Sequence, residues 1–145
     1  MHLRDCILNS NCTASSSRPI CQGQLEIKNE SDCSRITEKY WSSIVVDNAM
    51  CNSLSGDLII SNNPCLDTMI IHSGTFGGIT SMYLHYLPEL TSMEIADSSF
   101  LNITHFEMES LFSYYFIRDL PRLFLLTVGS MSFYNTKSIS IISCF

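Results

Sequence analysis

The chain has 145 residues, of which 46% are hydrophobic and 15% charged, and its formal net charge is -6. This composition supports one small buried core and excludes a wholly disordered tail. The acidic balance, with lysines and arginines that nowhere cluster beside aromatic residues, argues against a nucleic-acid partner. The longest charge-free stretch, residues 68–88, is interrupted by Gly, Ser, Thr and His, so we interpret it as strands and turns and expect no transmembrane segment.

The first forty residues form a separate region, rich in Ser and Asn, that contains four of the seven cysteines: Cys6, Cys12, Cys21 and Cys33. Residues 1–40 are predicted to be either a disulfide-stapled cap or a partly disordered segment with free thiols, because spacing alone does not fix the pairing. An end cap would shield the rest of a repeat array. No Cys-x-x-Cys pair occurs, so we expect no metal site.

The sequence gives two opposing indications of the cellular compartment. Three glycosylation sequons begin at Asn11, Asn29 and Asn102, and they favour an extracellular or cell-surface location. Against this, the first five residues are followed by no apolar core, so no signal peptide is visible. Asn102 also falls at a predicted corner, where asparagine is favoured for its backbone geometry alone.

From residue 41 onward a six-residue pattern, apolar-x-x-apolar-x-apolar, recurs along the chain. Its last two apolar positions are two residues apart, which is strand alternation. The pattern begins at Trp41, Ser55, Leu66, Ile79, Leu90, Ile103, Phe112, Leu123 and Thr136. The strand residues predicted to point inward are Ile60, Ile71, Leu84, Ile95, Met108, Ile117, Val128 and Ile141. The links are too short for crossover helices, so we expect tight turns or extended segments.

Two such strands form a larger unit of about 24 residues that repeats three times. In each unit a phenylalanine falls ten residues after the first leucine, at Phe76, Phe100 and Phe133. The interval from Ile103 to Phe112 is shorter than the others, which indicates either a lost half-unit or a bulge that loops out. Equal offsets in adjacent units predict that the three phenylalanines stack.

The paired Leu-x-x-Met-x-Ile strands, with Thr75-Phe76, Ser99-Phe100 and Ser132-Phe133 at a fixed offset, resemble the leucine-rich repeat superfamily. The nearest likeness is to the BspA-like, Treponema-type repeats of bacterial and protist surface proteins, over residues 41–145. The resemblance implies a mainly β fold, a short leucine-rich-repeat-like β-solenoid with two strands per coil, used for protein binding or adhesion. The position that asparagine usually takes in such repeats holds Gly74, Ser98 and Met131, so the usual asparagine ladder is not expected.

The predicted partner-binding face consists of outward residues on adjacent strands: Tyr83, His85, Glu107, Glu109, Phe116 and Arg118. Exposed aromatic residues on a flat strand array are typical of sites that grip a protein or glycan ligand. Alternatively, Tyr83 and Phe116 cover each other and are structural. The sequence does not indicate which face is concave.

The sequence gives little support for a catalytic function. The four histidines (His2, His72, His85 and His105) do not converge with a serine and an acid. The predicted register places His72 beside Ala96, His85 beside Glu109 and His105 beside Ser81. Glu107 and Glu109 alternate on one strand, which is typical of a solvated face. We therefore predict a non-catalytic binding or adhesion module without cofactors; the alternative is a β-helix carbohydrate-active enzyme.

The last strand, residues 138–142, is followed by no polar capping segment. An uncovered end templates association with other chains. This predicts either a longer array or self-association through the C-terminal coil.

Overall fold

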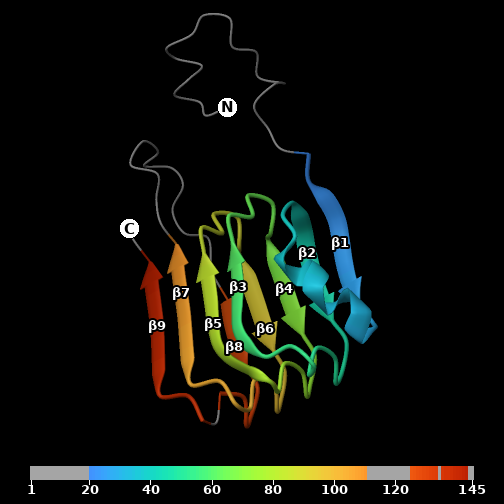
Figure 1. The fold of residues 1–145 in the computed structure, drawn as a ribbon. Coiled ribbons are helices and arrows are strands. Elements are labelled where there is room, and N and C mark those ends of the chain that lie inside the picture. Colours follow the sequence, from blue (N-terminus) through green and yellow to red (C-terminus); the bar gives the residue numbers. More distant parts are fainter. Residues whose placement is uncertain (1–19, 111–124, 134, 144–145) are drawn as a thin grey trace, which may run out of the picture.

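The computed structural model describes residues 20–110, 125–133 and 135–143. Their strands form two parallel sheets, one of five strands in the order β1-β2-β4-β6-β8 and one of four in the order β3-β5-β7-β9 (Figure 1). The elements are β1 (Gln22–Ile27), the 3-10 helix η2 (Glu30–Thr37), β2 (Trp41–Val46), β3 (Gly56–Ser61), β4 (Thr68–Ile71), β5 (Ile79–His85), β6 (Ser92–Ile95), β7 (His105–Ser110), β8 (Leu125–Val128) and β9 (Ser138–Ser143).

The described residues are mainly strands, but the prediction of a leucine-rich-repeat-like β-solenoid is wrong. The described residues instead form a small α/β-like fold of two parallel sheets, in which η2 connects β1 to β2. The sequence pattern detects strand alternation, whereas η2 buries only Cys33 and Ile36, three residues apart. A search for residues two apart therefore passes over this helix. Strand β1 shows the alternation at Leu25 and Ile27, but Gln22 stands where the six-residue pattern requires a first apolar residue, so the full pattern misses this strand as well.

Pairing within each sheet follows the spacing of the pattern. Met69 lies opposite Met93 in the five-stranded sheet, and Met82 lies opposite Phe106 in the four-stranded sheet. The expected pairing of His85 with Glu109 is confirmed. The short interval after Ile103 does not disturb either sheet, because β6 pairs directly with β8 and β7 pairs directly with β9.

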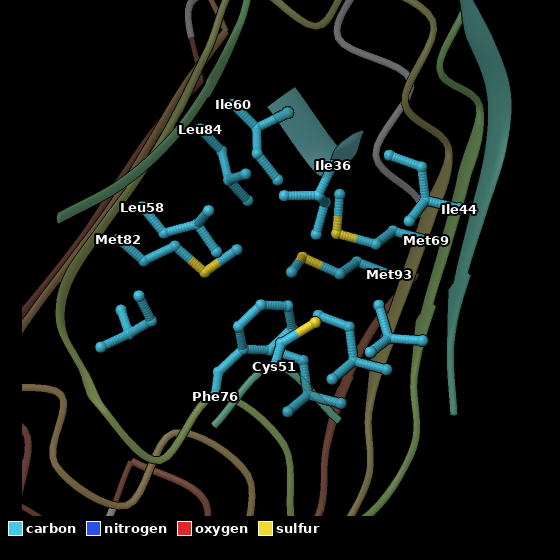
Figure 2. Packing of buried hydrophobic residues seen from close by; sticks show 14 of the residues in the cluster. Ile36, Ile44, Cys51, Leu58, Ile60, Met69, Phe76, Met82, Leu84 and Met93 are labelled. Carbon is cyan, nitrogen blue, oxygen red and sulfur yellow. The ribbon is translucent and has the colours of Figure 1, made fainter. Parts of the chain in front are cut away.

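The core lies between the two sheets, whose strands run in opposite directions (Figure 1). Figure 2 shows Met69 and Met93 of one sheet facing Leu58 and Met82 of the other. Among the residues predicted to point inward, Ile60, Ile71, Leu84, Ile95 and Met108 are buried, as expected. Val128 is 42% exposed, contrary to the prediction, because β8 is the last strand of its sheet in the described part of the chain. Ile117 and the side chain of Ile141 lie outside the described residues.

The phenylalanine column is confirmed. The rings of Phe76 and Phe100 stack at 4.9 Å between centroids with 10° between planes, and those of Phe100 and Phe133 stack at 5.6 Å and 11°. Phe76 and Phe100 are fully buried. All three residues have φ between 55° and 57°, in the left-handed region that non-glycine residues rarely adopt. The column therefore fixes the corner between consecutive strands as well as filling the core.

A column of hydroxyl groups accompanies the rings, formed by the residue before each phenylalanine. The Thr75 hydroxyl lies 3.1 Å from that of Ser99, which in turn donates to the His72 carbonyl at 3.0 Å. The Ser132 hydroxyl accepts from the Ser99 N–H at 3.3 Å. Thr75 and Ser99 are buried, so these bonds satisfy polar groups that water cannot reach. In the sequence these residues indicate only the fixed offset before each phenylalanine.

Replacing Ser99 with alanine should lower the free energy of unfolding by about 1–3 kcal/mol, because it removes the hydroxyl that bonds the N–H and hydroxyl groups of buried Thr75 in the neighbouring corner. Urea denaturation would measure this loss. Ser130→Ala, at an exposed position one corner away, is the matched control and should change stability by less than about 0.5 kcal/mol. Equal effects of the two substitutions would contradict a structural role for the hydroxyl column.

Within the described residues, two disulfides connect residues 20–40 to later parts of the chain. Cys21 is bonded to Cys65, and Cys33 of η2 is bonded to Cys51. Leu25 and other buried side chains of β1 and η2 lie in the same hydrophobic core as the later strands. Residues 20–40 are therefore packed and covalently fastened, and Cys6 and Cys12 lie outside the described range.

No helix in the described ranges is long and apolar enough to cross a membrane, in keeping with the expectation of no transmembrane segment. The charge-free stretch 68–88 contains strands β4 and β5, as the sequence indicates.

Candidate functional site

The outer face of the four-stranded sheet carries the predicted binding residues. Strand alternation buries Leu58, Met82 and Phe106 and turns their neighbours outward. As a result Ile59, Tyr83 and Glu107 lie side by side across β3, β5 and β7. We call the group on this face the outer patch; its members are Ile59, Tyr83, His85, Tyr86, His105, Glu107 and Glu109.

An imidazole and two carboxylates converge at the centre of the outer patch. His85 Nε2 lies 3.0 Å from Glu107 Oε2 and 4.0 Å from Glu109 Oε2. His85 and Glu109 are direct partners in the register of β5 and β7, and Glu107 is the diagonal neighbour. The three side chains are 26–28% exposed, so they are partly screened by their surroundings yet reachable from solvent.

Aromatic rings surround this cluster. The Tyr83 ring contacts the His85 ring edge-on, with centroids 5.9 Å apart, and the His105 ring at 5.4 Å. Tyr86, just after the end of β5, meets His85 edge-on at 6.3 Å. Ile59 and Tyr86 are 50% and 45% exposed. The outer patch thus combines exposed apolar surface with a pair of acidic groups.

Four of the six predicted site residues come together in the outer patch: Tyr83, His85, Glu107 and Glu109. Phe116 and Arg118 lie outside the described residues, as does the alternative contact between Phe116 and Tyr83. Tyr83 is in contact with the two histidines.

The sequence did not predict that the outer patch also contains Ile59, Tyr86 and His105. Ile59 had a detectable signal, because it is an apolar residue between two inward positions, Leu58 and Ile60, and so must face outward. His105 was placed correctly beside Ser81, but its ring reaches Tyr83 diagonally, and the spacing alone does not show that contact.

No protein-family model, curated protein or solved structure matches this chain. The resemblance to BspA-like repeats therefore stays a prediction. The residues of the outer patch and their geometry are what support a function.

Proposed function

We propose that this protein is a non-catalytic binding module that holds a protein partner, in adhesion or in another cell-surface contact, through the outer patch. The observation that carries the proposal is the presence of exposed Ile59 and Tyr86 and half-buried Tyr83 on one sheet face, beside two carboxylates. Apolar and aromatic side chains that surround a few charges are the usual composition of binding hot spots.

Charge favours a partner with basic residues. Glu107 and Glu109 lie together, and no lysine or arginine in the described part of the chain forms an ion pair with either of them. A partner arginine or lysine would gain carboxylate contacts and stack on Tyr83 or Tyr86. The chain's formal net charge of -6 would speed the approach of such a partner.

Two disulfides support a location outside the reducing cytosol, because such bonds persist in oxidising compartments. This agrees with the sequons at Asn29 and Asn102 and with a role in surface contacts.

The arrangement of carboxylates gives no support to the alternative of a carbohydrate-active enzyme. Glycoside hydrolases place two carboxyl groups on either side of the bond that they cleave. Here Glu107 and Glu109 both approach the same imidazole from one strand. A glycan ligand without cleavage is a different outcome, and the experiment below separates it from a protein partner.

The test is a binding screen with the purified chain against an array of cell-surface proteins and an array of glycans. For any hit, the variant Ile59→Ala/Tyr83→Ala should weaken binding at least about tenfold, because it removes the exposed apolar contacts. Its melting temperature should stay within a few degrees of the parent value, since both side chains lie on the outward face.

The matched control is Ile70→Ala/Glu94→Ala, at paired positions on the outer side of the five-stranded sheet. It should bind as the parent does. Equal weakening by both double variants, or an outer-patch variant that unfolds and yet binds normally per folded molecule, would contradict the site. Hits confined to glycans would replace the protein partner by a carbohydrate.

A further inference from the structure

We propose that His85, Glu107 and Glu109 form a binding site for one divalent transition-metal ion, with zinc the best match. This inference stands independently of the proposed partner, because it rests on the three side chains alone. One nitrogen and two carboxylate oxygens from two adjacent strands supply the ligands.

The distances fit such an ion. Zinc bonds to nitrogen and carboxylate oxygen at about 2.0–2.2 Å, so two ligand atoms in a tetrahedral shell lie about 3.4 Å apart. His85 Nε2 is 3.0 Å from one carboxylate oxygen and 4.0 Å from the other, values on either side of that separation. The three ligand atoms all lie within 4.8 Å of one another. Small side-chain rotations would complete the shell without moving the strands.

The charges also fit. Two glutamates on the same face of β7 repel each other, and His85 is the group that pairs with them in the described residues. A neutral imidazole and two carboxylates carry two negative charges, which a divalent cation balances. The imidazole adds a ligand that first-row transition ions prefer over Ca²⁺ or Mg²⁺, whose usual ligands are oxygen atoms.

The surroundings hold the imidazole in place, and this sets the site apart from a simple acidic cluster. Tyr83 and Tyr86 both pack edge-on against the His85 ring. The ligands stand on paired strands of a sheet, so their backbone positions are fixed before any ion arrives. Three protein ligands leave at least one coordination position for water at this partly exposed face.

The test is calorimetric titration of the full chain with zinc chloride, after alkylation without reductant so that no free thiol competes. We expect binding of one equivalent of Zn²⁺. Affinity should fall at least about tenfold in each of His85→Gln, Glu107→Gln and Glu109→Gln, because each removes a ligand while keeping a polar side chain of similar size. Circular dichroism spectra of the three variants should match that of the parent chain, which shows that they fold.

A second measurement identifies the atom involved. In long-range proton–nitrogen NMR spectra, Zn²⁺ should shift the Nε2 resonance of His85 and leave that of His72, at an exposed position after β4, unchanged. His72→Gln and Glu94→Gln are the matched controls and should bind Zn²⁺ as the parent does. The proposal is overturned if no zinc binds, if the controls lose as much affinity as the ligand variants, or if the His85 resonance does not move.

Discussion

Replacing Phe100 with alanine is expected to lower the free energy of unfolding by about 3–5 kcal/mol. Phe100 is fully buried and is the middle ring of its column, stacked on Phe76 and on Phe133. Its removal leaves a cavity and breaks both stacking contacts, each of which adds to the burial term. A domain of this size is stabilised by only about 5–15 kcal/mol in total, so the loss is a large fraction of its stability. Guanidinium denaturation monitored by circular dichroism would measure the loss.

Two substitutions serve as controls for the column. Phe100→Leu keeps most of the volume and should recover part of the lost stability. Leu101→Ala changes the next residue, which is 37% exposed, and should have a much smaller effect. If Phe100→Ala proved no worse than Leu101→Ala, the stacked column would not be a main source of stability.

Removing the disulfides should have effects nearly as large. With sequence separations of 44 and 18, loop-closure entropy predicts losses of about 4 kcal/mol for Cys21–Cys65 and about 3 kcal/mol for Cys33–Cys51. The paired variants Cys21→Ala/Cys65→Ala and Cys33→Ala/Cys51→Ala would be compared with the parent chain by chemical denaturation. The second pair also lies in the core, where both sulfurs are inaccessible, so its alanine variant loses packing in addition.

The two bonds should also differ in their reaction with a mild reductant. Cys21 is exposed, whereas Cys33 and Cys51 are fully buried, and thiol exchange requires access to a sulfur. Mass spectrometry of alkylated peptides should therefore detect reduction of Cys21–Cys65 first. Simultaneous release of both bonds, or no loss of stability in either double variant, would contradict this account.

The strands and their registers were predictable because each depends on a short local pattern. Residues such as Met69 and Met93 sit at equal places in the repeat, so their pairing follows from spacing alone, and the stacking of Phe76 on Phe100 follows with it. The helix η2 was not predictable in this way, because only two of its side chains are buried and they lie three residues apart. The fold class was predicted wrongly because the six-residue pattern covers neither η2 nor β1.

The candidate site was predictable in part for the same reason. Register placed His85 beside Glu109, but the closer contact of its ring, with Glu107, depends on how the side chains turn across a diagonal. The disulfide pairing could not be predicted from the sequence, because cysteine spacing does not fix connectivity. Cys33 lies in η2, an element that the strand pattern did not predict, and it is bonded to Cys51.

The pairing of β6 with β8 and of β7 with β9 bears on how the sequence of such a protein can change in evolution. Corner residues in successive units are 24 positions apart at Thr75 and Ser99, but 33 apart at Ser99 and Ser132, and both sheets still pair in register. The longer spacing falls between β7 and β8, and the strands on either side keep their pairing. Strand pairing therefore tolerates a change of chain length between β7 and β8, which makes this point of the sequence a natural place for evolution, or for a protein engineer, to insert new residues.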